Sequence, residues 1–212
     1  MAIVHPREMP HIPKVESTFT LDEGTVVSRH DEGRRGTVSQ VREPIWSARF
    51  ESQPTDLGGR AEWQAWKNTL RGGLRSFLAW DVSRYEPRAY PNGIPEIIAG
   101  TWNGQGTVTS LATPGQIAAA GTPAGFMLLA GDRVGLIEGG RYGYFDVSAD
   151  ATADGTGAII VEVEPLVPSL FTTAAVIVFR RPRLLMQMIN GSFSAPGTAG
   201  LVPVSFDAVQ VL

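Results

Sequence analysis

A single stretch of this 212-residue chain has a strongly helical pattern, and it covers residues 60–72. Trp63, Trp66 and Leu70 recur there at spacings of three and four residues, which places them on one face of a helix. Two glycines end the pattern, because glycine adopts the left-handed conformation at a helix end without a Cβ clash. The rest of the chain is therefore expected to fold largely from strands and turns.

The segment that follows the helical stretch has the pattern of a buried strand. Residues 74–81 are rich in apolar and aromatic side chains, including Phe77 and Trp80. Prolines then end regular structure, and Tyr90 lies in this proline-rich exit at residues 85–91. We interpret the helix and its strand as the elements that fill the hydrophobic core of a β-rich domain. We expect the tryptophans of the helix to be buried against a sheet or a neighbouring subunit.

Elsewhere the chain has the pattern of short strands separated by turns. It contains 24 glycines and 15 prolines, which suit an all-β protein with many turns. The predicted fold class is mainly β: a β-sandwich with one packed α-helix and an inserted small β-barrel-like module. Alternation of apolar and polar residues, or a short apolar run between turn residues, marks each expected strand. These strands are residues 24–28, 35–41, 45–51, 126–129, 133–137, 142–147, 158–164, 172–179, 184–190 and 201–212.

Changes of composition along the chain predict its domain order. Residues 1–20 contain three prolines and no periodicity, so we expect an extended N-terminal arm that either packs on a neighbour or is loosely ordered. Residues 21–91 and 169–212 are expected to form the β-sandwich domain around the helix. Residues 92–168 form a meander of turns and short strands, and we expect them to be the inserted β module.

The composition argues against several classes of protein. The chain has no cysteine, which removes disulfides, thiolate catalysis and cysteine-based zinc sites. A net charge of -3 provides no overall attraction for nucleic acid, so no nucleic-acid specificity is expected. No stretch approaches about 18 consecutive apolar residues, so we expect no membrane insertion. The N-terminal residues also lack the pattern of a secretory signal.

Residues that could carry catalysis or bind a metal are scattered. His5, His11 and His30 all lie in the first 30 residues, and the chain contains no Gly-x-Ser-x-Gly or His-Glu-x-x-His motif. Asp150 and Asp154 are four residues apart, which does not fit the alternating ligands of a calcium-binding loop. We therefore predict no enzyme activity, no cofactor and no bound metal.

Three further features have structural explanations. Residues 100–106 are rich in glycine but lack the Lys-Ser/Thr of a phosphate-binding loop, so a flexible turn is expected. Asp132 follows a glycine and is interpreted as a hairpin-turn residue. Glu162 and Glu164 are two residues apart on a predicted strand, so they face one side, as on a solvated surface. A pocket with two carboxylates facing each other would instead favour a hydrolase.

Aromatic residues beyond the helix leave a second function open. Trp102, Tyr142 and Tyr144 would stack on a sugar ring if they were exposed beside polar side chains. The alternative function is therefore a carbohydrate-binding β module that contacts a host surface. Burial of these rings in a core or an interface is the more common arrangement for aromatic residues of strands.

Several short segments also carry a resemblance to a known family, over about residues 60–170. They are Trp66 with Leu70-Arg71-Gly72, Phe77-Leu78-Ala79-Trp80-Asp81, Pro87-Arg88-Ala89-Tyr90-Pro91, Gly125-Phe126, Ala130-Gly131-Asp132, Tyr144-Phe145-Asp146-Val147, Asp154-Gly155-Thr156-Gly157-Ala158 and Val163-Glu164-Pro165-Leu166-Val167-Pro168. Their order resembles that of tail proteins from long-tailed bacteriophages. The most similar role is that of the distal tail protein, also called the baseplate-hub ring protein.

This resemblance implies a structural virion component without catalysis. In that family a β-sandwich with one helix forms a ring, commonly a hexamer, between the tail tube and the hub. The resemblance implies a homo-oligomer, with residues 21–91 and 169–212 as the ring (belt) domain. It implies the tail tube protein and baseplate hub proteins as partners, assembly in the host cytoplasm, and a place in the virion tail. The structural or interface candidates are Trp63, Trp66, Leu70, Phe77, Trp80, Tyr90 and Asp132.

Overall fold

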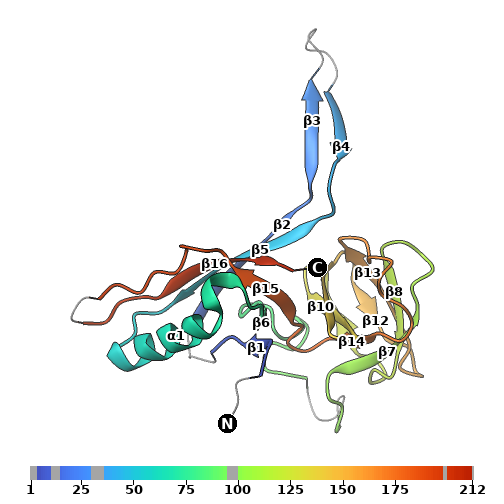
Figure 1. Ribbon diagram of the computed structural model, residues 1–212. Helices are drawn as coiled ribbons and strands as arrows, with labels where there is room; N and C mark the ends of the chain where they lie inside the picture. Colours follow the sequence, from blue (N-terminus) through green and yellow to red (C-terminus); the bar gives the residue numbers. More distant parts are fainter. Residues whose placement is uncertain (1–3, 11–14, 30–35, 95–99, 198–199, 212) are drawn as a thin grey trace. The chain divides into compact units, whose positions relative to one another are not determined.

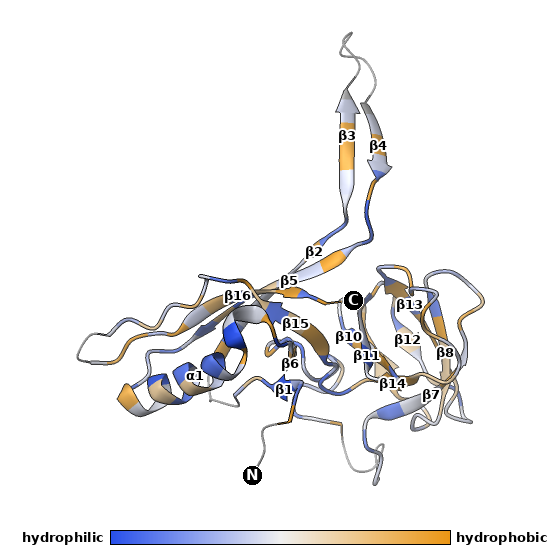
Figure 2. Cartoon of the chain, in the orientation of Figure 1, coloured by the Kyte–Doolittle hydropathy of each residue, from blue (hydrophilic) through white to orange (hydrophobic). Residues whose placement is uncertain are grey.

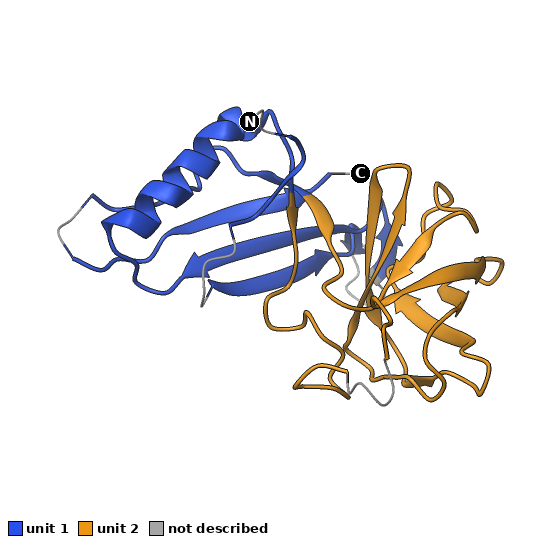
Figure 3. Ribbon diagram, turned by 90° about the horizontal axis from the view of Figure 1, so that it is seen from below, with its two compact units in different colours: residues 1–77, 186–211 blue, residues 78–185, 212 orange. Residues whose placement is uncertain are grey.

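The computed structural model describes residues 4–10, 15–29, 36–94, 100–197 and 200–211. The chain is mainly β, as predicted, with one α-helix in these ranges and a closed six-stranded barrel. It divides into two compact units, which are residues 1–77 with 186–211 and residues 78–185 with residue 212 (Figure 3). The first unit contains the helix, and the second contains the barrel.

Most of a six-stranded sheet with the strand order β1-β6-β15-β16-β5-β2 belongs to the first unit, whereas residues 78–79 of β6 and 184–185 of β15 are counted in the second (Figure 1). Its long strands pair antiparallel, β2 with β5, β5 with β16, and β16 with β15. The strand nearest the C-terminus, β16, therefore lies inside the sheet and falls within the strand predicted at residues 201–212. The strands are β1 (Arg7–Glu8), β2 (Val15–Asp22), β5 (Ile45–Ser52), β6 (Phe77–Ala79), β15 (Leu184–Met188) and β16 (Ser205–Gln210).

Strand β2 corrects the prediction that the whole of residues 1–20 is an arm outside the sandwich domain, because the chain joins the sheet from Val15 onward. It pairs with β5 along its whole length, from Val15 opposite Ser52 to Asp22 opposite Ile45. Val15 and Phe19 are buried, and the residues that follow each of them are exposed. Pairing with β5 supplies backbone hydrogen bonds that the local sequence does not indicate, because β propensity depends strongly on cross-strand neighbours.

Helix α1 (Leu57–Thr69) begins three residues before the predicted start at residue 60. Asp56 caps it, since its Oδ1 accepts a hydrogen bond from the Gly59 amide at 2.9 Å. Glycine is a poor helix former, which explains why the first turn is not evident from the sequence. A Cβ at Gly59 would also lie 2.1 Å from the Thr55 hydroxyl oxygen, so a larger residue there would force the Thr55 side chain to move.

The turn after helix α1 shortens the strand predicted at residues 74–81. A 3-10 turn, η1 (Arg71–Gly73), follows the helix, and Gly72 within it has a positive φ of 65°. The amide of Arg75 then bonds the carbonyl of Leu70 at 3.1 Å. Backbone groups that are used in this turn are not available to a sheet, so β6 spans only Phe77–Ala79.

A second hairpin of the first unit is separate from the six-stranded sheet. Strands β3 (Thr25–Arg29) and β4 (Gly36–Gln40) pair only with each other in the described part of the chain. Figure 1 shows this two-stranded ribbon leaving the sheet at the ends of β2 and β5. At its base Gly24 has a φ of +66°, and a Cβ there would lie 2.5 Å from the Arg42 carbonyl oxygen. The geometry therefore requires glycine at this position.

The second unit is a closed antiparallel barrel with the strand order β10-β11-β13-β8-β7-β14. A short additional sheet consists of β9 (Met127–Leu128) and β12 (Ala151–Thr152). The barrel strands are β7 (Gln105–Ser110), β8 (Gln116–Ala120), β10 (Arg133–Glu138), β11 (Arg141–Val147), β13 (Ile159–Glu164) and β14 (Val176–Val178).

Alternation along the barrel strands produces one apolar core. Along β13, Ile159, Val161 and Val163 are buried, while Ile160 and the two glutamates are exposed. Strand β14 pairs with both β10 and β7 and so closes the barrel. The barrel therefore extends beyond the module boundary expected at residue 168. No helix in the described ranges is long and apolar enough to cross a membrane.

Candidate functional site

The aromatic residues singled out by the sequence lie in two separate cores. In the first unit, Trp63 and Trp66 are only 1% and 2% exposed, and Leu70 and Phe77 are fully buried. The Trp66 ring lies 5.0 Å from the Phe77 ring and meets it edge-on. Edge-to-face contacts of this kind stabilise the packing beyond the area that they bury. These four side chains therefore belong to the hydrophobic core of the first unit, where they pack against its strands.

The other three candidates belong to the second unit. Trp80 is buried, and the Arg181 guanidinium lies 3.7 Å above its ring centroid. Tyr90 is buried, and its hydroxyl accepts a hydrogen bond from the Met127 amide at 2.9 Å. Asp132 is buried as well, and the structure gives it a second partner beyond its own turn. The seven candidates thus do not form one site.

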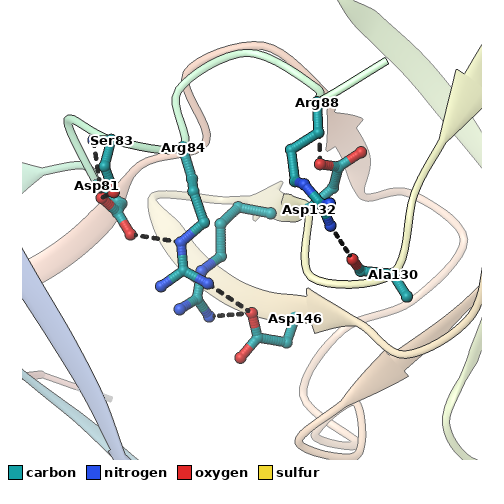
Figure 4. Close-up of polar contacts among 8 residues, drawn as sticks. Asp81, Ser83, Arg84, Arg88, Ala130, Asp132 and Asp146 are labelled. Carbon is teal, nitrogen blue, oxygen red and sulfur yellow. Dashed lines mark hydrogen bonds and ion pairs between the residues drawn. The ribbon is translucent and has the colours of Figure 1, made fainter.

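Asp132 connects the turn before β10 to the segment that precedes the barrel in sequence. Its Oδ2 accepts a hydrogen bond from the Leu129 amide at 2.8 Å, as a turn residue does. Its Oδ1 accepts a bond from the Arg88 amide at 2.9 Å, and the Arg88 side chain donates to the Ala130 carbonyl at 2.6 Å (Figure 4). Both carboxylate oxygens therefore have backbone partners.

Four charged side chains of the second unit form an ionic cluster, in which Asp81 and Arg133 are buried and Arg84 and Asp146 are partly exposed. Figure 4 labels Asp81, Arg84 and Asp146. Arg84 Nε donates to Asp81 Oδ2 at 2.9 Å, and its Nη1 lies 3.7 Å from Asp146 Oδ1. Arg133 Nη1 lies 2.5 Å from the same Asp146 oxygen. Arg133 and Asp146 are opposite each other in the register of β10 and β11, so the barrel itself brings them together.

Burial dominates the electrostatics of this ionic cluster. It raises the pKa of Asp146 from its ordinary value, and the guanidinium groups of Arg133 and Arg84 oppose that rise. Burial likewise raises the pKa of the Tyr144 hydroxyl, whose ring lies under the Arg133 guanidinium at 5.4 Å. Two cations face two carboxylates, so the charges balance. Such a cluster positions the segment around residue 84 on the barrel.

An ion pair and a backbone hydrogen bond also hold the same segment. Arg180 binds both carboxylate oxygens of Glu86, with its Nε at 3.1 and 3.0 Å. The Arg181 amide donates to the Tyr85 carbonyl at 2.6 Å. Bidentate pairing of arginine with a carboxylate fixes direction as well as distance. Side-chain and backbone contacts therefore hold residues 80–90 on the barrel, and the groups that make these contacts already have partners.

The residues that the sequence analysis weighed for metal or anion binding do not come together. Among the described residues, no group of three or more His, Asp or Glu side chains could hold a metal ion. Asp154 Oδ1 accepts bonds from Thr156 and Ala158 within its own turn, at 2.7–3.0 Å. Glu162 and Glu164 lie exposed on the outer face of β13. His11 and His30 lie outside the described residues.

The rings considered for carbohydrate binding are partly used in packing. Tyr144 is buried in the second unit. Trp102 is half-buried against the barrel core, with its ring 5.0 Å from Phe126, and its Nε1 donates to the Gln105 carbonyl. Tyr142 is half-exposed on β11. Carbohydrate binding stays a prediction without a specific contact in its favour.

The two-stranded ribbon of β3 and β4 is the most exposed regular element of the first unit. Its described side chains, residues 25–28 and 37–40, are all exposed. Val27 and Val38 are directly opposite each other and are 58% and 63% exposed. Figure 2 shows a hydrophobic band across the middle of both strands. This apolar pair is the strongest candidate for a functional surface, and only its strand pattern, not its exposure, was evident from the sequence.

The ribbon is anchored by a polar turn at its base. Asp22 Oδ1 accepts a hydrogen bond from the Gly24 amide at 2.9 Å, and this bond lowers the pKa of the carboxyl group. The guanidinium of Arg42 also binds the Asp22 carboxylate. The Val41 amide donates to the Gly24 carbonyl at 2.9 Å. These contacts define where the hairpin leaves the sheet.

Comparisons with known proteins add no family for the chain. No protein-family model matches it, and no curated protein matches it at a significant level.

Proposed function

We propose that this chain is a structural protein of a bacteriophage tail, forming a homo-oligomeric ring at the distal tail or baseplate that joins the tail tube to the hub. The observation that carries the proposal is the exposed ribbon of β3 and β4, with its Val27–Val38 pair. The resemblance of residues 60–170 to distal tail proteins supplies the place in the virion. The proposed partners are further copies of the chain, the tail tube protein and baseplate hub proteins.

The ribbon of β3 and β4 favours the self-assembly hypothesis, because few contacts within one chain stabilise it. An isolated two-stranded hairpin is marginal in water, and a third strand or a packed layer is needed for independent stability. Here neither face of the ribbon is covered by another described element, and valines are exposed on both. Contact with neighbouring copies would bury the valines and complete the ribbon.

The two units differ in how readily they could add strands from a neighbour. The barrel of the second unit is closed, and closure removes free strand edges. In the first unit, β2 lies at the edge of the sheet and is eight residues long. A long edge strand presents unpaired backbone groups that another chain can bind. This contrast supports the first unit as the ring-forming part.

The test is the oligomeric state of the purified full chain, measured by sedimentation and by negative-stain electron microscopy. We expect a ring for the wild type and dissociation for the variant Val27→Asp with Val38→Asp, because a charge on this apolar pair opposes burial. Leu57→Asp is the control, since Leu57 is 74% exposed in the first turn of helix α1, where an acidic residue is tolerated.

Two outcomes would contradict the proposal. One is a wild-type chain that stays monomeric at high concentration and forms no ring. The other is a ring that the aspartate variant leaves intact, which would remove the ribbon from the interface. Localisation of the chain in assembled particles by electron microscopy tests the proposed position between tube and hub.

A further inference from the structure

We propose that a basic patch beside the end of helix α1 binds the acidic outer face of strand β13 on a second copy of the chain. This inference rests on the proposed ring, and it names a contact that would hold neighbouring copies together. The basic patch consists of His5, Arg7, Arg71 and Arg75 around the exposed side chain of Leu74. The acidic face consists of Ile160, Glu162 and Glu164.

Hydrogen bonds bring three members of the basic patch to the last residue of helix α1. Arg7 Nη1 donates to the Thr69 hydroxyl at 3.3 Å, and Arg75 Nη1 donates to the Thr69 carbonyl at 3.3 Å. The same Arg75 nitrogen lies 3.0 Å from His5 Nε2. Strand β1 and the turn after the helix therefore converge, although they are more than 60 residues apart in sequence.

Arg71 and Leu74 extend this basic patch into solvent. Arg71 is exposed and has a φ of 51° in the turn after the helix, and its carbonyl accepts a bond from the Leu74 amide. The Leu74 side chain is 83% exposed. Burial lowers the pKa of His5, and the nearby charges of Arg75, Arg7 and Arg71 lower it further.

The charge of the basic patch exceeds what the chain itself neutralises. In the described ranges, Arg7, Arg71 and Arg75 make no ion pair with a carboxylate. The C-terminal end of a helix carries about half a negative charge, which accounts for one nearby cation but not for three. An anionic partner is therefore expected.

The outer face of β13 has the opposite charge around a similar apolar side chain. Ile160, Glu162 and Glu164 alternate with buried residues, so all three point outward. Successive residues on one face of a strand are roughly 7 Å apart, so the two carboxylates are close neighbours. In the described ranges neither glutamate makes an ion pair. The chain therefore contains one cationic and one anionic surface, each next to an exposed leucine or isoleucine.

Charge decides how two copies would use these surfaces. Two basic patches cannot face each other across a symmetric dimer contact, because like charges would be brought together. A basic patch and an acidic face on different copies can pair reciprocally in a two-fold dimer or once in a head-to-tail contact, and the head-to-tail contact, which closes into a ring when the rotation permits, is the one that the proposed ring requires. The phosphate groups of nucleic acid are the other anions that the basic patch could bind. The net charge of -3 on the chain disfavours that binding, because it repels a polyanion.

The test is a charge exchange in the full chain, with association measured by sedimentation at low and high salt. We expect Arg71→Glu to weaken association about tenfold, and Glu162→Arg with Glu164→Arg to weaken it by at least as much. All three substitutions together should restore association, because opposite charges face each other again. Arg141→Glu makes the same charge change at an exposed residue outside both surfaces and should leave association unchanged.

Each other outcome has a defined meaning. A wild-type ring that neither variant weakens, or a combined variant that does not recover, overturns this contact and leaves the proposed ring standing. A monomeric wild type overturns both proposals. A labelled DNA duplex that binds the wild type but not Arg71→Glu, while self-association is unchanged, would assign the basic patch to phosphate. Circular dichroism and thermal unfolding of each variant separate loss of contact from loss of fold.

Discussion

The indole ring of Trp66 lies 5.5 Å from the ring of Phe206, and this contact joins helix α1 to strand β16 near the other end of the chain. The Trp63 ring lies 5.6 Å from the same phenylalanine, and the Phe50 ring stacks on Phe206 at 5.0 Å. One phenylalanine of the last strand is thus in contact with the helix and the central sheet together. The core of the first unit is complete only when β16 is in place.

Truncation of either tryptophan should therefore destabilise the first unit strongly. We expect Trp66→Ala to lower the free energy of unfolding by about 3–5 kcal/mol, because it leaves a cavity between the helix and the sheet. Urea denaturation followed by circular dichroism measures this change. Leu57→Ala, at an exposed position of the same helix, should change stability by about 0.5 kcal/mol or less. Equal effects of the two substitutions would contradict the assignment of Trp66 to the core.

From the ionic cluster we predict strong coupling between the buried Arg133 and the partly exposed Asp146. Asp146→Leu leaves the Arg133 guanidinium, whose side chain is 2% exposed, without its nearest carboxylate, and should cost about 3 kcal/mol. The double variant with Arg133→Met should cost clearly less than the sum of the single variants. The exposed pair Arg49 and Asp207, 3.8 Å apart, is the matched control and should show coupling below about 1 kcal/mol. Additive costs at both pairs would show that the buried charges do not depend on each other.

Asp154 predicts an acid-dependent contribution to stability from the turn before β13. Hydrogen bonds from Thr156, Ala158 and Gly157 lower the pKa of its carboxyl group below the ordinary value. The ionised group therefore stabilises the fold above the unfolded pKa of about 3.9, and this contribution is lost as the pH falls through the lower folded pKa. We expect the melting-temperature difference between the wild type and Asp154→Asn to shrink as the pH falls. A difference that stays constant from neutral to acidic pH would contradict this origin.

We predict that substitution of Gly24 destabilises the ribbon of β3 and β4 locally. Gly24→Ala combines a positive φ with a Cβ placed 2.5 Å from a backbone oxygen, so it should cost about 1–3 kcal/mol at the base of the hairpin. Hydrogen exchange of residues 25–29 and 36–40 should accelerate. Gly139→Ala has a positive φ of 56° with no atom within 4 Å of the new Cβ, and should cost about 1–2 kcal/mol. Unchanged exchange in Gly24→Ala would show that the ribbon does not depend on this turn.

The amino-acid sequence alone determined the class of the fold and most of its strands. The helix was evident because Trp63, Trp66 and Leu70 repeat with helical spacing, and β13 was evident because its residues alternate in polarity. A local pattern, a glycine followed by an aspartate, also predicted Asp132 as a turn residue. The hydrogen bond that its carboxylate accepts from the Leu129 amide agrees with this prediction. The proposed place in a phage tail also came from the sequence, through the order of short segments, and it stays a prediction.

Contacts between residues far apart in sequence decided the rest. Strand β2 forms because β5 pairs with it, and β14 belongs to the barrel because β10 and β7 lie on either side of it. The ionic cluster needs the β10–β11 register, and the basic patch needs β1 beside the end of helix α1. A local pattern shows which side of a helix or strand is apolar. Which strand pairs with which, in what register, and which charged side chains meet depend on contacts between residues that are far apart in sequence.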